Sequence, residues 1–554
     1  MELLVDLFGY LSIVVHGLTI LAQSVALGGI VFFALLARPL AARLGAPGAT
    51  ILAGTARIAA WAAVGLVAAE GATVALQSAV LADTVGLSAT EVLSAEFAVA
   101  GLIKAAVAAT MAAILLHRRT RSPALLLLGL AVLELCAATA TTHAAARLDA
   151  RLPLLAVEWL HQAGAAIWIG GIPCFLLALR SVQGAEAWRL VGARYSRLSM
   201  VGVACIVLSG LTMCLLYIGS WEGLYGTAYG VMVGAKIVMF LMLLGLGFGN
   251  LLLTERMRRD PATPVLRMRR FAFVEFGLGI SIFFAAASLT SVPPAADLTE
   301  DRASWHEILE RNMPVWPRLS SPDHDTLALP ALQSRLDEEA AHHAAKPPAA
   351  FTPGSGDLPP RNAADIAWSE YNHHWAGVCV ALIGLLALLN QAGLRWARHW
   401  PLLFLALAGF LFLRSDPEVW PLGEIGFFES LRDVEVLQHR AVLPLLVAFA
   451  LCEWRVRARG WANPVALMVF PFMCVLGGTL LLTHSHAIAN VKEQLLVELT
   501  HTPLAIAGIV AGWARWLELK LDPATSPIAH RVAAWTWPVC LLLCGLMLLN
   551  YREA

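Results

Sequence analysis

The sequence predicts an all-α polytopic membrane protein of about 14 transmembrane helices. Of its 554 residues, 58% are hydrophobic and 14% are charged, whereas about 25% are charged in an average soluble domain. Apolar runs that can cross a hydrocarbon layer of about 30 Å recur along nearly the whole chain. Helices are expected because backbone polar groups in lipid need partners within the same segment. The formal charge of zero gives no reason to expect a nucleic-acid partner.

Each predicted helix corresponds to one of these apolar runs. The tenth and eleventh are the shortest. In chain order the predicted spans are 8–36, 52–80, 96–117, 124–144, 153–180, 198–218, 228–253, 270–292, 370–391, 399–413, 437–452, 462–483, 496–517 and 531–550.

The connections between the spans alternate in charge. Every second connection is basic, as at 117–121, 255–270 and 455–459, and the others are acidic or neutral, as at 83–96 and 416–435. Because Lys and Arg are concentrated in cytoplasmic loops, this alternation places both termini on the external side.

The chain divides at a proline-rich stretch. Residues 1–292 predict a first membrane module of about eight helices, and residues 369–554 predict a second one of about six. Between them, residues 293–368 predict an external linker that includes "AAKPPAAFTPGSGDLPP". An amphipathic helix near 324–343 is compatible with its pattern, and the remainder predicts little regular structure.

Nine histidines share one predicted depth, near the external ends of the spans. A single histidine there usually caps a helix or anchors it at the interface. Nine at one depth favour a metal or haem site, since imidazole is costly in hydrocarbon and faces a cavity or a partner. The candidate ligands are His16, His143, His161, His373, His374, His439, His484, His486 and His501.

Two stretches of the chain share one pattern, which suggests related modules. Residues 141–171 and 482–513 both have Thr-His at the end of a span, a short polar turn, and Glu-x-x-His in the next helix. Glu158 thus matches Glu498, and His161 matches His501. A spacing of three places each pair on one helix face, where the carboxylate can orient the ring. The alternative is an ordinary hydrogen bond within the helix.

The predicted pairing of His16 with His373 and His374 extends this likeness. It relates helices 1–6 to helices 9–14, which would cross the membrane in the same direction. Internal repeats of this kind are common in transporters.

Charged residues also occur inside the predicted spans, where they are functional candidates by default. Glu70, Lys104 and Lys236 all lie toward the external half, and Glu134 lies in the fourth span. Ion pairing among them and a role in proton or ion conduction are both open interpretations.

Several of these motifs together resemble the copper resistance protein D (CopD) family of bacterial inner-membrane proteins. The resemblance rests on the "TTHAA" turn, "WLHQAGAAIWIGG", "RYSRLS" and "LYGTAYGVMVGAKIVMF", and covers roughly residues 1–295. It implies copper movement across the inner membrane, so that the external side, with both termini, would be periplasmic, and it carries over His143, His161 and His16 as ligands. The chain departs from what Cu(I) favours, since its methionines are scattered. Met213, Cys214, Met239 and Met242 are the nearest soft ligands.

Three hypotheses follow. The first is a non-enzymatic copper transporter with external histidine sites, and the second is a haem b electron-transfer protein whose axial histidines include pairs such as His16 with His161. The third is a scaffold that docks a periplasmic copper-binding protein through the external segment. Membrane lipid is an expected partner in each. The chain has no P-loop motif for ATP. Transport direction, copper oxidation state, energy source and oligomeric state stay open.

Overall fold

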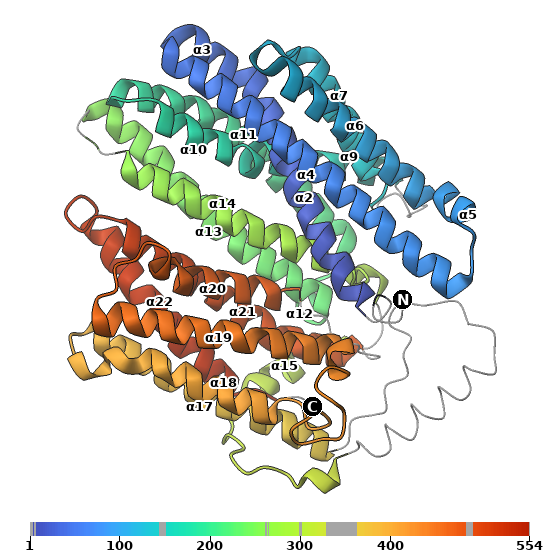
Figure 1. Ribbon diagram of the computed structural model, residues 1–554, viewed down its shortest axis with the longest axis vertical. Coiled ribbons are helices and arrows are strands. Elements are labelled where there is room, and N and C mark those ends of the chain that lie inside the picture. Colours follow the sequence, from blue (N-terminus) through green and yellow to red (C-terminus); the bar gives the residue numbers. More distant parts are fainter. Residues whose placement is uncertain are drawn as a thin grey trace. The chain divides into compact units, whose positions relative to one another are not determined.

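The structure, a computed structural model, is nearly all helical, which confirms the predicted fold class (Figure 1). No β-strand occurs within the part of the chain that it describes. The structure describes residues 4, 7–142, 151–260, 263, 265–298, 302–327, 363–483 and 491–552. For residues 89, 325, 434–435 and 491–494 it describes the backbone and not the side chains.

Twelve helices among these residues are long and apolar enough to cross a membrane, by length and composition. Two shorter apolar helices, Ala124–Thr139 and Ala466–Leu481, take the places of the fourth and twelfth predicted spans. All fourteen predicted spans therefore correspond to helices. The longer helices extend past the predicted limits, as in Ala46–Val85, which corresponds to the predicted span 52–80.

The helices form two compact units. The first bundle consists of residues 11–220 and 236–297, and the second bundle of residues 1–10, 221–235 and 298–554. The first holds α2 (Phe8–Phe32, from residue 11), η1 (Phe33–Ala37), α3 (Arg38–Leu44), α4 (Ala46–Val85), α5 (Ala89–Ser94), α6 (Glu96–Arg118), α7 (Ala124–Thr139), α9 (Arg151–Ala165), η3 (Ala166–Gly170), α10 (Ile172–Ser181), α11 (Ala185–Tyr217), most of α13 (Ala228–Arg259) and α14 (Leu266–Leu289). The second holds α12 (Trp221–Tyr225), α15 (Trp305–Asn312), α17 (Ala363–Gln391), η6 (Arg395–Leu402), α18 (Leu403–Arg414), α19 (Val434–Arg459), α20 (Ala466–Leu481), α21 (Val491–Lys520) and α22 (Pro527–Leu549).

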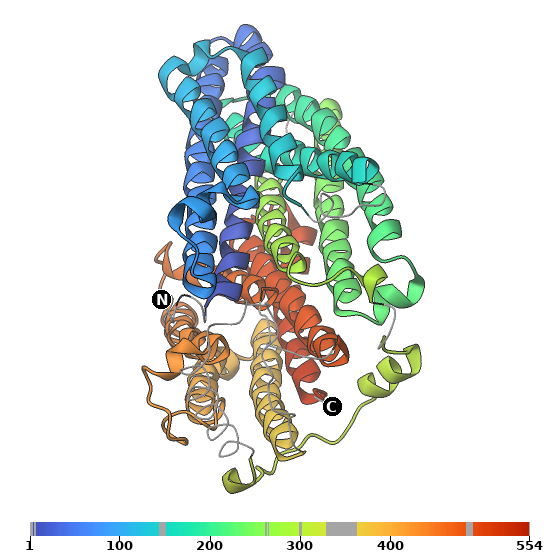
Figure 2. The same ribbon diagram turned by 90° about the vertical axis from the view of Figure 1, so that its right-hand side faces the viewer.

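In the first bundle, α4 runs alongside α6 in both views (Figures 1 and 2). Small and aliphatic side chains fill the space between them, among them Ala59, Ala63 and Met111, which are almost fully buried. Alanine-rich surfaces let helix backbones approach closely where lipid supplies no hydrophobic drive for association. Charged residues on α4, α6 and α7 therefore lie within a closely packed group of helices.

Two π-turns in the first bundle come just before prolines. The π-turn η1 precedes Pro39, and η3 precedes Pro173 near the start of α10. Proline has no N–H and its ring clashes with the carbonyl of residue i−4, so the wider turn lets the helix continue past it. The turn η3 also presents Gly170, where an added Cβ would strike the backbone of Ser24 in α2.

In the second bundle, α22 packs against both α17 and α21. Glycines allow backbone contact between α17 and α22: a Cβ on Gly384 would strike the backbone of Leu542, and one on Gly545 would strike Ala381. One turn before this contact surface, Gly377 meets the backbone of Leu549. The start of α17, which carries two of the predicted histidines, is thereby set against the residues that follow α22.

The linker predicted at 293–368 contains a helix that the sequence analysis did not predict. In α15, the Ser304 side chain accepts from the backbone of Glu307, while Glu307 accepts from the backbone of Ser304. This capping box is visible in the sequence as "SWHE". Of the amphipathic helix predicted near 324–343, residues 324–326 form a 3₁₀ turn, and the part from residue 328 lies outside the described residues.

Replacing Gly384 by Ala tests the contact between α17 and α22. The added methyl must displace the backbone of Leu542, so we expect a loss of about 1–3 kcal/mol of stability and a lower midpoint of thermal unfolding in detergent. Gly409→Ala in α18 is the matched control, because an added Cβ there meets nothing within 4 Å, and alanine favours a helix by about 0.5–1 kcal/mol. An equal response of the two variants would contradict this packing.

Candidate functional site

An aromatic cluster in the second bundle joins two of the predicted histidines. His373 on α17 stacks on Tyr551, which follows α22, with ring centroids 3.7 Å apart and an interplanar angle of 17°. The ring of His501 on α21 stands nearly perpendicular to both, with its centroid 6.1 Å from His373 and 6.3 Å from Tyr551. Three separate segments thus bring two imidazoles and a phenol together.

The hydrogen bonds of the two rings define which nitrogen of each can act as a ligand. Nδ1 of His373 lies 2.9 Å from the carbonyl oxygen of Ser369, and Nδ1 of His501 lies 2.9 Å from that of Val497. A carbonyl oxygen can only accept, so Nδ1 carries the hydrogen in both rings. The basic nitrogen is then Nε2, and a bond from Nδ1–H to a backbone carbonyl is the usual way to orient a metal-binding histidine.

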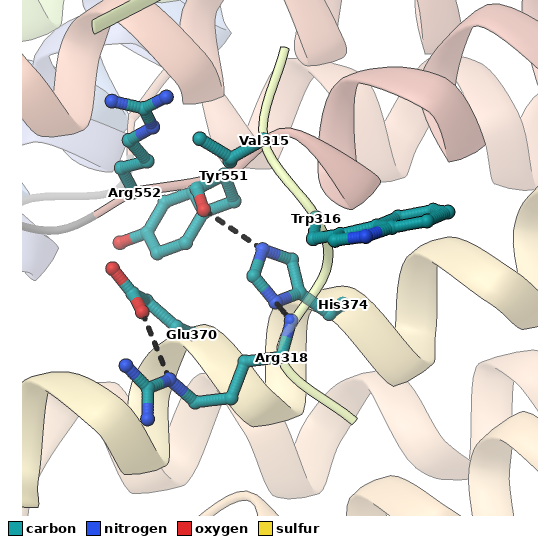
Figure 3. A pocket seen from close by; sticks show the side chains of 7 residues that line it. All are labelled: Val315, Trp316, Arg318, Glu370, His374, Tyr551 and Arg552. Carbon is teal, nitrogen blue, oxygen red and sulfur yellow. Dashed lines mark hydrogen bonds and ion pairs between the residues drawn. The ribbon is translucent and has the colours of Figure 1, made fainter. Parts of the chain in front are cut away.

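His374 differs from its neighbour because both of its ring nitrogens are bonded to backbone groups. Nδ1 accepts from the N–H of Arg318 at 2.7 Å, and Nε2 donates to the carbonyl of Tyr551 at 2.9 Å (Figure 3). The ring is 2% exposed. His374 therefore joins the external segment to the end of α22, and in this conformation it offers no nitrogen to a metal.

A pocket of about 420 Å³ lies beside His374. Within it the guanidinium of Arg318 pairs with Glu370 at 3.2 Å (Figure 3). Arg552 is held by the carbonyls of Glu310 and Met313. These bonds tie the C-terminal residues to α15 and the chain after it. The remaining lining residues are Val315, Trp316, His374 and Tyr551.

The other predicted ligands are dispersed. Nδ1 of His161 lies 3.0 Å from the hydroxyl of Ser209, and His439 pairs with Asp416 at 2.8 Å. His16 is partly buried on α2, two turns from Gln23 on the same face. Among the described residues, no group of three or more His, Cys, Asp or Glu is arranged to hold a metal ion. His143, His484 and His486 lie outside the described residues.

The two Glu-x-x-His motifs agree with each other in detail. Glu158 accepts from Gln162 at 3.1 Å, and Glu498 accepts from Thr502 at 2.6 Å, in each case four residues along the helix. The Nδ1 atom of each histidine bonds elsewhere, as described above. The predicted role of the glutamates in orienting the rings is therefore not seen at Nδ1.

The charged residues inside the spans fall into two groups. Nζ of Lys104 pairs with Glu70 at 2.9 Å, so this predicted ion pair is present. The ion pair consists of Lys104 and Glu70, whereas Lys236 lies where Glu158, Cys214 and His161 are its electrostatic neighbours. In the first bundle, the side chain of Gln23 donates a hydrogen bond to Gln162, and Gln162 donates one to Glu158.

A buried ionic network in the second bundle was not predicted from the sequence. Glu453 on α19 binds both Arg457 at 2.6 Å and Arg515 of α21 at 3.2 Å, and Arg515 also binds Glu518 at 2.7 Å. Glu518 accepts from the indole of Trp537. The signal was the spacing of opposite charges, four apart in Glu453–Arg457 and three apart in Arg515–Glu518, which is typical of paired positions on a helix.

The fold and these contacts define a multi-pass helical membrane protein that keeps polar side chains within two bundles. Residues 189–289, which include most of α11 and all of α13 and α14, match the family described as copper resistance protein D. This confirms the predicted resemblance, and the matched region is narrower than the predicted 1–295.

One curated relative gives the same indication. The chain is 33% identical over 157 residues to the copper transport protein CutJ of Bacillus subtilis (strain 168). The aligned part covers 28% of this chain and 28% of that protein. The comparison with solved structures gave no match. The family match at 189–289 ends before the second bundle's histidines begin at His306.

Replacing His374 by Ala tests its structural role. The change leaves the amide of Arg318 and the carbonyl of Tyr551 without their partner, at a cost of about 1–3 kcal/mol. We expect faster hydrogen–deuterium exchange at Arg318, measured by mass spectrometry. Trp316→Ala is the control, because this pocket residue is 96% exposed. Exchange at Arg318 that stays at the wild-type rate in His374→Ala would contradict this structural role.

Proposed function

We propose that this chain moves copper across a bacterial inner membrane, and that His373 and His501 bind the copper on the periplasmic side. The observation that carries the proposal is the pair of imidazoles whose Nδ1 atoms are both fixed by backbone carbonyls. Copper is the cargo in this proposal, and no catalysed reaction is part of it.

The donor set suits copper. Imidazole is a good ligand for copper, whereas carboxylate and carbonyl groups suit Mg²⁺ and Ca²⁺. Ring centroids 6.1 Å apart are within the span of two imidazoles that share one ion, given a metal–nitrogen distance of about 2 Å. Stacking on Tyr551 restricts the tilt of His373. Two nitrogen ligands without a thiolate bind a passing ion with a lower affinity than a closed four-ligand site, which suits transport.

The two bundles differ at their matched histidines. In the first bundle, Lys236 acts electrostatically on His161, and its charge disfavours a cation there. In the second, the rings of His373 and Tyr551 pack against His501. Because two imidazoles meet there, we assign the first copper contact to the second bundle. The family and the relative named above both have copper in their descriptions, and this supports copper as the cargo.

Copper uptake into proteoliposomes tests the proposal. We expect His373→Ala and His501→Ala each to lower Cu(I) uptake at limiting copper by about tenfold, equivalent to about 1.4 kcal/mol of binding. His399→Ala is the matched control, since its ring lies in η6 and accepts from Trp454. Uptake by both cluster variants at the wild-type rate would contradict the assignment of the site.

The same two imidazoles also suit the axial positions of haem b, which bundles bind through histidines on facing helices. The visible spectrum of the purified protein separates the two functions. A protein that carries copper alone has no Soret band. A Soret band that disappears in His501→Ala would replace the copper proposal with the electron-transfer one.

A further inference from the structure

The first bundle contains a buried carboxylate that neither the copper site nor the packing accounts for. Glu134 on α7 is 0% exposed, and neither of its carboxylate oxygens has a hydrogen-bond partner among the residues that the structure describes. It lies between Ala131 and Leu135, which belong to the apolar core of this bundle. A carboxylate in such a place costs several kcal/mol if it is charged and unpaired.

Two further charges act on Glu134, those of Glu70 on α4 and Lys104 on α6. Lys104 pairs with Glu70 at 2.9 Å, and the two side chains are 13% and 1% exposed. One ammonium therefore stands against two carboxylates. With Glu134 protonated the cluster is neutral, and with Glu134 ionised it carries one uncompensated negative charge inside the membrane-spanning region.

Among the described residues, the other elements with the most contacts to α7 are α9 and the π-turn η1. The cation of α9, Arg151, is exposed at the start of that helix. Further along α9, Glu158 accepts from Gln162, and His161 is bonded to Ser209. The turn η1 has the sequence FALLA, and Arg38, which follows it, donates to the carbonyl of Ser122.

We propose that Glu134, together with the Glu70–Lys104 ion pair, forms a buried proton-binding site in which Glu134 takes up and releases one proton. A proton is the cation that a single carboxylate can hold without other ligands. A metal ion such as Na⁺ would need several oxygen ligands and would be repelled by the ammonium of Lys104. Because the three residues come from three helices, release of the proton would alter the charge that these helices enclose.

This site gives the bundle a means to couple helix packing to protons. An ionised Glu134 competes with Glu70 for Lys104, so the ion pair between α4 and α6 would weaken when the proton leaves. The inference stands without the copper proposal, because it concerns residues of the first bundle and its test uses no metal.

Infrared difference spectroscopy of the full-length protein in detergent tests the inference. At neutral pH we expect a carboxylic-acid carbonyl band that shifts in D₂O and loses one component in Glu134→Gln. Glu91→Gln is the control, because Glu91 lies in α5, where it accepts from Ser88 near the surface. A carbonyl band unchanged by Glu134→Gln would overturn the proposal.

Glu70→Gln is an independent second variant. It removes the partner of Lys104, so the ammonium is left to Glu134, which should ionise and lose the same band component. A component that keeps its full intensity in Glu70→Gln would contradict the coupling between the two carboxylates. Addition of Na⁺ at constant pH should leave the wild-type component in place, and its loss would identify a sodium site instead of a proton site.

Discussion

The structure depends on one constraint, that polar groups within a membrane-spanning segment must find their partners inside the chain. Threonine hydroxyls meet it by bonding to a carbonyl one turn back, as Thr73 and Thr110 do. The histidines meet it in the same way, since Nδ1 of His373 and of His501 each bond to the carbonyl of residue i−4. This bond also determines the tautomer of each ring: Nδ1 carries the hydrogen, and Nε2 is the basic nitrogen.

The same constraint leads to different results in the two bundles. In the second bundle, Glu453, Arg457, Arg515 and Glu518 form a network in which two positive charges balance two negative ones. In the first bundle, Lys104 pairs with Glu70, so Glu134 has no cation to balance its charge within this cluster. Balanced buried charges hold helices together and are costly to disrupt. An unbalanced cluster depends on a proton, which gives it a response to conditions that the balanced one lacks.

The helices could be predicted from the sequence because their signals are local. Apolar length and the alternation of basic loops need no knowledge of packing, and all fourteen predicted spans have a helix in the structure. The depth of the histidines predicted a shared role, and this stays a prediction. Which of them meet could not be predicted, because that depends on the glycine contacts that set α17 against α22. Adjacent residues show this most clearly: His373 faces Tyr551 and His501, whereas His374 is bonded to backbone on both sides.

Tyr551 and Glu134 show two further limits of the sequence. Tyr551 follows the last span as a single aromatic residue, and nothing in the sequence indicates that its ring stacks on His373. Glu134 was recognisable as an intramembrane charge, but its lack of partners depends on three helices. The resemblance to copper resistance proteins was carried by motifs within residues 1–295, whereas the imidazole pair lies beyond them, in the second bundle. The choice of that pair as the site therefore rests on its own geometry, and the choice of copper as the cargo rests on the family match and the relative.

X-ray absorption spectroscopy of the copper-loaded protein tests this central claim most directly. The account predicts two nitrogen scatterers at about 2 Å with the outer-shell pattern of imidazole, reduced to one imidazole in His501→Ala. A copper shell dominated by sulfur, or an imidazole count unaffected by the loss of His501, would contradict it.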